Sequence, residues 1–216
     1  MRTNIFGIDL SGPSNTKEST LVSFEAKNKS LQMTTAIEGI TDLSIYGAIV
    51  EKSANVKVIV GIDAPLSYNP GGGDRQSDKD LRKLIIAKGM PSGSVMPPTL
   101  NKMAYLTLRG ISVSRFLESH PNKKINIVEV HPSGSMALRG APVKSIKKMK
   151  SSAKAKQTLL KWMEYQGLNG IDLSGSVSDH YVAACAAALA AWKWYLGESV
   201  WIFKSEMPFH PYDFAC

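Results

Sequence analysis

The stretch NIFGIDLSGP, residues 4–13, is a run of apolar residues that ends in one aspartate, Asp9, before Ser-Gly-Pro. Its nearly continuous apolar character predicts a buried strand over Asn4–Leu10. An acid after a strand often only caps a helix or closes a turn, so Asp9 alone indicates little. Its meaning depends on whether the chain repeats the pattern.

The pattern recurs twice along the chain. VKVIVGIDAPLS, residues 56–67, predicts a strand over Val56–Ile62 that is followed by Asp63. KINIVEVHPSGS, residues 124–135, predicts a strand over Lys124–Val130 that contains Glu129 near its end. Functional groups of open α/β sheets gather at the carboxyl ends of the strands, so we expect the three acids to converge if these strands are parallel neighbours.

The rest of the chain predicts one α/β domain over residues 1–216, with a mixed sheet and helices on both of its faces. An insertion after the fourth strand, about residues 69–100, is rich in glycine and proline around a short helix. The other expected strands are Ser19–Glu25 and Ser30–Ile37, and Val200–Lys204 is expected as a short final strand or an extended tail. The expected helices are Asp42–Ser53, Ser77–Lys88, Asn101–Ser119 with a break near Gly110, Lys150–Tyr165 and Asp179–Leu196.

The composition limits the class of protein. A chain of 216 residues with 44% hydrophobic content can bury a substantial core. It has no apolar run near the roughly 18–20 residues that cross a bilayer, and no signal peptide is apparent before Asp9. The cysteines, Cys185 and Cys216, form no closely spaced pair. We therefore expect a cytoplasmic protein that is not in a membrane.

The net charge of +8 is concentrated in one segment. Between Val130 and Met163 there is no acid, and the basic residues there are Arg139, Lys144, Lys147, Lys148, Lys150, Lys154, Lys156 and Lys161. If the helix of this region begins early, Lys147, Lys150 and Lys154 share one of its faces. Such a segment favours an anionic partner, with nucleic acid as the first candidate, and a solvated lysine-rich surface is the plainer alternative.

Carboxylates that converge in a cleft need a cation, because like charges a few ångströms apart cannot all stay ionised. Hard divalent ions with a preference for oxygen, Mg²⁺ or Mn²⁺, are the natural occupants. Asp179 begins a predicted helix that can reach the same edge of the sheet, and the adjacent His180 suits proton transfer. Asp9, Asp63, Glu129 and Asp179 are thus candidate metal ligands, and His180 joins them as a catalytic candidate.

Basic residues that flank the acids are candidates for holding phosphate. Arg75, Arg82 and Arg109 follow Asp63 in the chain, and an arginine fork matches phosphate oxygens well. Structural ion pairs with Asp74, Asp78 and Asp80 are an equally good explanation for them. Ser11 lies in the Ser-Gly-Pro turn after Asp9, where backbone N–H groups can meet a phosphate.

Six motifs occur in order along the chain and together carry a resemblance. They are GIDLSGP (7–13), GIDAPLS (61–67), R-x-x-D-x-x-L-R (75–82), LTLRG (106–110), VEVHPSGS (128–135) and SDHYVAACAAALAAW (178–192). As a set they resemble the uncharacterised-domain family 429, described as predicted nucleases with a ribonuclease-H-like fold. The chain is similar, more distantly, to Holliday-junction resolvase-like nucleases.

The resemblance implies a ribonuclease-H-like form of the mixed sheet. It implies that Asp9 is the acid of the first strand, Asp63 that of the central strand, Glu129 that of the fifth strand and Asp179 that of the helix. Thr107, Arg109 and Gly110 fall in the helix motif of the family.

Three classes of function remain open on the sequence alone. The first is a Mg²⁺- or Mn²⁺-dependent nuclease acting on DNA or RNA. The second is a nucleic-acid-binding module without catalysis, which needs only the lysine-rich segment. The third is a nucleotide-binding ATPase or phosphotransferase of related fold, although the chain is short for two such domains and has no second glycine-rich phosphate motif. The oligomeric state is open as well.

Overall fold

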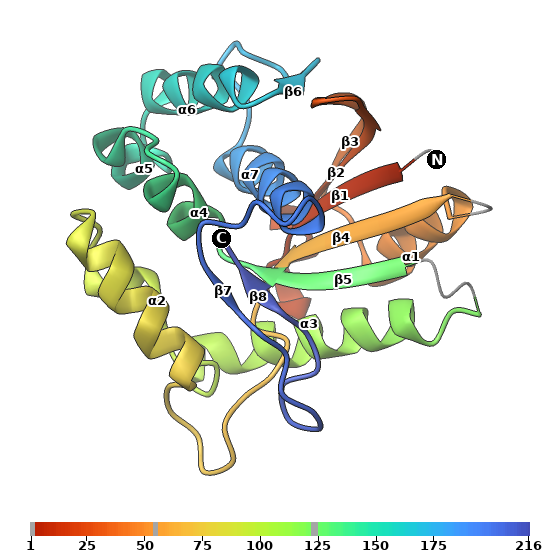
Figure 1. The fold of residues 1–216 in the computed structure, drawn as a ribbon, viewed down its shortest axis with the longest axis vertical. Helices are drawn as coiled ribbons and strands as arrows, with labels where there is room; N and C mark the ends of the chain where they lie inside the picture. Colours follow the sequence, from red (N-terminus) through yellow and green to blue (C-terminus); the bar gives the residue numbers. More distant parts are fainter. Residues whose placement is uncertain (1–2, 54–55, 122–124) are drawn as a thin grey trace.

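The computed structural model describes residues 3–53, 56–121 and 125–216. Within these residues one mixed sheet of eight strands, in the order β6-β3-β2-β1-β4-β5-β8-β7, runs through the molecule (Figure 1). Its strands are β1 (Thr3–Asp9), β2 (Thr20–Lys27), β3 (Ser30–Glu38), β4 (Lys57–Asp63), β5 (Ile125–Val130), β6 (Leu168–Asn169), β7 (Ile202–Phe203) and β8 (Phe214–Ala215). Strands β1, β2 and β3 form an antiparallel meander, and β4 and β5 run parallel to β1.

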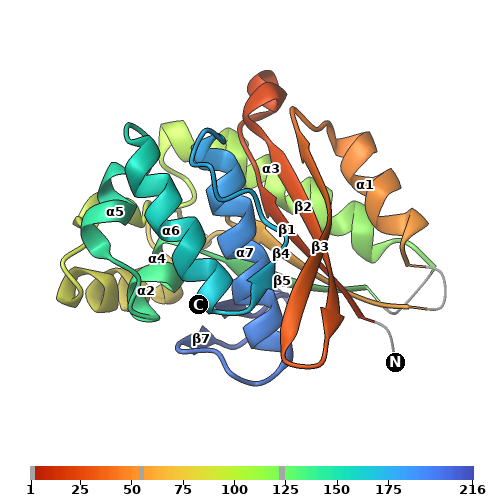
Figure 2. The ribbon, with the colours of Figure 1, turned by 90° about the horizontal axis from the view of Figure 1, so that it is seen from above.

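Helices cover both faces of the sheet. They are α1 (Asp42–Glu51), α2 (Gln76–Ala87), α3 (Asn101–Glu118), α4 (Pro132–Leu138), α5 (Val143–Lys148), α6 (Ala153–Tyr165) and α7 (Asp179–Tyr195), with short 3₁₀ turns η1 (Pro13–Glu18) and η2 (Ser92–Ser94). Figure 2 shows α1 and α3 on one side of the sheet and α4, α5, α6 and α7 on the other. Each side has its own apolar core, because the side chains of a strand alternate between the two faces.

Helix α7 packs on β1 and β4 at very close range. A Cβ atom at Gly7 would lie 2.0 Å from the carbonyl oxygen of Ala184, and one at Gly61 would lie 2.7 Å from that of Ala187. Only glycine fits at these two positions, and the alanines of α7 face them. This packing brings the N-terminal end of α7 to the edge of the sheet where β1 ends at Asp9.

The predicted mixed α/β sheet with helices on both faces is confirmed, and the structure corrects several details. The segment Val200–Lys204, expected as a short final strand or an extended tail, has its strand part at β7. The short strands β6 and β8 were not expected. No break occurs near Gly110, since α3 is continuous and Gly110 instead allows close contact with Pro65, whose oxygen would lie 2.8 Å from an added Cβ.

The predicted start of the helix expected over Lys150–Tyr165 is also wrong. Helix α6 begins at Ala153, because the side chain of Ser152 accepts a hydrogen bond from the backbone N–H of Ala155 and caps it. Lys150 therefore lies in the connection between α5 and α6, and Lys147 lies on α5. The three lysines expected on one helical face come from three different segments. Of the strand expected over Lys124–Val130, Lys124 is outside the described residues.

The insertion between β4 and α3 contains α2 and η2. In the described part of the chain, no helix has the length and apolar character that a membrane span requires.

We predict that Gly7→Ala lowers the free energy of unfolding by about 3 kcal/mol, because the new methyl group meets backbone atoms that cannot rotate away. Gly47→Ala is the matched control, since Gly47 lies within α1 and has open space around it. Alanine there should raise stability by about 0.5–1 kcal/mol through helix propensity. Urea denaturation measures both. Equal changes in the free energy of unfolding for Gly7→Ala and Gly47→Ala would show that the packing of α7 on β1 does not require glycine at position 7.

Candidate functional site

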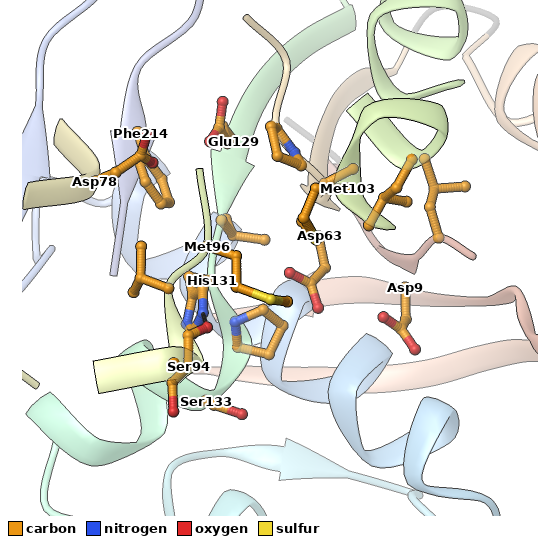
Figure 3. Close-up of a pocket in the computed structure, with 18 of the residues that line it drawn as sticks. Asp9, Asp63, Asp78, Ser94, Met96, Met103, Glu129, His131, Ser133 and Phe214 are labelled. Atoms are coloured by element: carbon orange, nitrogen blue, oxygen red, sulfur yellow. Dashed lines mark hydrogen bonds between the residues drawn. The ribbon is translucent and has the colours of Figure 1, made fainter. Parts of the chain in front are cut away.

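A pocket of about 410 Å³ opens at the carboxyl ends of β1, β4 and β5 (Figure 3). Asp9 and Asp63 both line it, as the sequence predicts for acids that end parallel strands. The two residues are direct partners in the register of β1 and β4. They share the sheet face of Gly7 and Gly61, which is the face that α7 covers.

Asp9 and Asp63 interact strongly with one another. Burial raises the pKa of Asp63 well above its usual range, and the charge of Asp9 and a hydrogen bond with Asp9 raise it further. Burial also raises the pKa of Asp9, although contact with His180 opposes this effect. The pair therefore resists carrying two negative charges, and it needs a proton or a cation to balance them.

The N-terminal end of α7 brings His180 and Asp179 to the same edge. Nδ1 of His180 lies 2.7 Å from Oδ2 of Asp9, and its Nε2 lies 4.0 Å from Oε2 of Glu18. The hydrogen bond to Asp9 raises the pKa of His180, so the imidazole keeps its second proton to a higher pH than a free histidine does. Asp179 is close enough for its charge to raise the pKa of Asp9.

Glu129 lines the pocket but does not join the two aspartates. In the parallel register Glu129 pairs with Ile62, one residue before Asp63, so its side chain belongs to the opposite face of the sheet. Figure 3 shows its carboxylate directed away from Asp63 and Asp9. Both of its oxygens are engaged, since Arg75 donates to Oε1 at 2.5 Å and to Oε2 at 2.8 Å, and the backbone N–H of Leu66 donates to Oε2 at 2.9 Å.

Arg75 is the centre of a buried ion-pair network. Its side chain is only 4% exposed and donates to Asp78, Glu129 and Ser67. Burial opposes the charge of Arg75, but Glu129 and Asp78 more than offset this and raise its pKa. Arg75 therefore holds the insertion against β5. All three nitrogens of its guanidinium already donate within the protein, so none is left for a phosphate.

The other two candidate arginines are structural as well. Arg82 donates to both oxygens of Asp74, at 2.5 and 2.6 Å, and to the carbonyl oxygen of Val95. Arg109 donates to Oδ1 of Asp42 at 2.7 Å and also to Ser11 and Ser19. All three arginines thus form ion pairs within the protein, which is the alternative considered for them, although Arg109 pairs with Asp42 rather than with Asp74, Asp78 or Asp80. Asp80 takes no part in these pairs and accepts instead from Gln76.

Ser11 is part of the internal bonding of the turn after β1. Its hydroxyl donates to the carbonyl oxygen of Asn15 and lies 2.9 Å from the hydroxyl of Ser19. Its backbone N–H donates to the same Ser19 oxygen, at 3.2 Å. The N–H group expected to meet a phosphate is thus directed into the protein.

The three candidate lysines are exposed, but only Lys150 lines the pocket. Its positive charge lowers the pKa of Asp63, which opposes the effects of burial and of Asp9. Lys147 and Lys154 lie outside the lining, on α5 and α6.

The four acids expected as metal ligands do not form a closed set of ligands. Among residues 3–53, 56–121 and 125–216, no group of three or more His, Cys, Asp or Glu side chains is placed to hold a metal ion. Asp9 and Asp63 meet as predicted, Asp179 lies within range of their charges, and Glu129 is paired with Arg75.

Sequence reasoning missed the roles of His131 and of the apolar pocket wall. His131 is half-buried, and removal of its ring from water lowers its pKa. Its Nδ1 accepts from the backbone N–H of Gly134, and its Nε2–H then donates to the carbonyl oxygen of Ser94 at 2.8 Å. Met96 and Met103 line the pocket beside the aspartates. The signal available was GSVMPPT, residues 93–99, whose apolar residues stand in a glycine- and proline-rich insertion that follows Asp63.

We predict that Arg75→Met lowers the free energy of unfolding by about 3–5 kcal/mol, because two buried carboxylates lose their counter-charge. Arg82→Met is the control, since Arg82 and Asp74 are each about one-fifth exposed and water can solvate the remaining acid. Its expected loss is about 1 kcal/mol or less. Urea denaturation at pH 7 measures both, and a small loss for Arg75→Met would contradict the central role of this arginine.

We predict that Asp63→Asn stabilises the protein at pH 8 in the presence of a chelator, by about 1–2 kcal/mol. A carboxyl whose pKa is higher in the folded state makes stability fall as the pH rises from the unfolded group's pKa through the folded one. Asparagine removes that loss, so the advantage of the variant should disappear below pH 4. Melting temperatures across this pH range test it, and Glu164→Gln, an exposed acid on α6, is the control. A variant that is less stable than the wild type at pH 8 would contradict this prediction.

Comparisons with known proteins support one assignment. The family model described as "Protein of unknown function (DUF429)" matches residues 7–207, which include Asp9, Asp63 and the whole of α7. Searches of curated proteins and of solved structures gave no significant match. The resemblance stated from the six motifs is thus confirmed at the level of the family, and the chain belongs to the DUF429 family.

Proposed function

We propose that this protein is a divalent-metal-dependent hydrolase that cuts phosphodiester bonds of DNA or RNA. The observation that carries the proposal is the pair of neighbouring aspartates, Asp9 and Asp63, in a pocket at the carboxyl edge of the sheet. A protein rarely keeps two acids so close in a buried place unless their charge has a use. A bound cation is the direct way to balance both charges.

The sheet supports a ribonuclease-H-like form of the fold. The antiparallel meander β1-β2-β3, followed by β4 and β5 parallel to β1, is consistent with the arrangement that the family resemblance implies. In such a sheet Asp9 and Asp63 occupy adjacent strand ends, and Asp179 and His180 approach from α7.

The donor set fits Mg²⁺ or Mn²⁺. Asp9 and Asp63 supply oxygen ligands only, and Asp179 is the nearby third acid. Mg²⁺ is usually bound through one or two carboxylates together with water and substrate phosphates, so a site without a complete set of protein ligands suits it. The ion, when bound, supplies a more acidic water and positive charge at the phosphate.

Other residues of the pocket have separate tasks. His180 holds Asp9 in place through Nδ1 and keeps a proton at Nε2 that faces Glu18. Lys150 brings a positive charge to the pocket and can attract a phosphate. The lysines outside the pocket, Lys147 and Lys154, are exposed and suited to longer-range attraction of a polyanion.

A nucleic-acid-binding module without catalysis is the second candidate. The segment that has eight basic residues and no acid favours it, because such binding requires only an exposed basic surface. It predicts salt-dependent binding that is the same with and without Asp9 and Asp63.

We predict that the purified protein cleaves labelled oligonucleotides with Mg²⁺ or Mn²⁺ and not with a chelator. Asp9→Asn and Asp63→Asn should each lower the cleavage rate by about 100-fold or more, because each removes a charged ligand. The substrates are single-stranded DNA, duplex DNA and RNA of one sequence. Glu164→Gln, which changes an exposed acid outside the pocket, is the matched control.

Cleavage that survives in both aspartate variants would rule the proposal out. A second measurement does not depend on turnover: Mn²⁺ should raise the melting temperature of the wild type and leave that of Asp63→Asn nearly unchanged. A protein that binds nucleic acid in a salt-dependent way, but shows neither cleavage nor a Mn²⁺ shift, would be the binding module instead.

A further inference from the structure

The pocket has two chemically different halves. Asp9, Asp63 and Lys150 form a charged half, and beside it Val95, Met96, Met103 and Leu106 form an apolar wall. Figure 3 shows Met96 extending toward Asp63, so the apolar wall begins next to the acids. A phosphate gains no favourable contact from a methionine side chain, whereas the face of a base or of a sugar gains an apolar contact. The wall therefore suits a part of the substrate other than the phosphodiester backbone.

The segment that carries Val95 and Met96 forms a fixed roof over the pocket, which we call the roof segment (residues 92–99). Three side chains from three elements hold its backbone carbonyl groups. His131 donates to Ser94, Arg82 donates to Val95 at 2.9 and 3.1 Å, and Thr107 donates to Pro98 at 2.8 Å.

A fourth contact closes the far end of the roof segment, where Oγ1 of Thr99 accepts from the backbone N–H of Gly73 at 2.8 Å. The roof segment is thus fastened along its length. These contacts hold the wall of the pocket in place without a bound ligand, as is usual for small-molecule sites.

We infer that the pocket takes one unpaired nucleotide of a single-stranded nucleic acid, with the base against Met96, Met103 and Leu106 and the phosphate toward Asp9, Asp63 and Lys150. The position of the phosphate rests on the proposed hydrolase, whereas the contact of the base with the apolar wall rests only on nucleic acid as the ligand, which both candidate functions share. A pocket of about 410 Å³ is in the range of small-ligand sites.

Duplex nucleic acid fits this pocket poorly. Its bases are stacked and paired within the helix, and an enzyme that needs one in a pocket must first extrude it at a cost of a few kcal/mol. A single strand already has unpaired bases, and contact with a base face is tolerant of sequence. The protein should therefore prefer single-stranded regions and have little sequence preference.

The experiment measures binding rather than cleavage. It uses fluorescence anisotropy with Asp63→Asn, which removes one negative charge from the pocket and leaves the probe intact, at low salt with a chelator. The probes are a labelled ten-nucleotide DNA single strand of mixed sequence and the blunt duplex of the same sequence. We expect the single strand to bind at least about 10-fold more tightly than the duplex.

The apolar wall is tested by adding Met96→Ala and Met103→Ala together, which should weaken single-strand binding about 10-fold and leave duplex binding unchanged. Met96→Leu with Met103→Leu keeps the wall apolar and should retain most of the affinity. Met207→Ala is the matched control, because Met207 is 75% exposed and lies outside the pocket. Melting curves confirm that each variant is folded.

Equal affinity for single strand and duplex would overturn the inference, and so would an alanine pair that binds as well as its parent. If the variant with Met96→Ala and Met103→Ala fails to fold, the test is the variant with Met96→Leu and Met103→Leu together with the comparison of single strand and duplex. Loss of single-strand affinity in the leucine variant would then reject the apolar wall as the site of the base. The proposed function fails separately, through absence of metal-dependent cleavage. A single-strand preference without cleavage would retain the base-binding wall and reject the hydrolase.

Discussion

The contact of α7 with β1 and β4 is the constraint on which the site depends. At Gly7 and Gly61 the helix backbone approaches so closely that a methyl group would overlap carbonyl oxygens of α7. The same two strands end at Asp9 and Asp63, each two residues beyond its glycine and on the same face. The packing that builds one of the two cores thus also sets the distance between His180 on the helix and Asp9 on the strand.

Two groups of buried charge lie at the edge of the sheet, and they differ in kind. Around Arg75, one guanidinium balances Asp78 and Glu129, so this group is satisfied within the protein. His180 and Lys150 act on Asp9 and Asp63 as positive partners, and the pKa of each aspartate is nevertheless raised. The first group is balanced by ion pairs within the protein, whereas the second needs a proton or a cation to balance its charges.

The position of Asp9 and Asp63 was predictable from the sequence, because apolar strands that end in acids and run parallel must place those acids at one edge. The place of Glu129 was not predictable in the same way. Its strand β5 is a neighbour of β4, as expected, but Glu129 pairs with Ile62 and its side chain therefore lies on the other face of the sheet. Apolar strands that are buried on both sides have no alternation of polar and apolar residues from which the register could be read.

The arginines show a second limit of sequence reasoning. Arg75 pairs with an acid 54 positions away and Arg109 with one 67 positions away, so no local pattern separates a structural ion pair from a phosphate ligand. The lysines show a third limit of sequence reasoning. Ser152 caps α6, so the helix begins at Ala153 and does not include Lys150, contrary to the prediction from the sequence pattern. Short strands such as β6 and β8 have two residues each and depend on neighbours that are distant in sequence.

Three of the contacts that hold the roof segment are to its main chain: His131, Arg82 and Thr107 donate to the carbonyl oxygens of Ser94, Val95 and Pro98. The side chain of Met96 takes no part in that fastening, although it lines the pocket. A substitution at this position can therefore change the apolar wall of the pocket without removing any of the hydrogen bonds that hold the roof segment. The shape of the pocket wall and the position of the aspartate pair are thus determined by different parts of the chain.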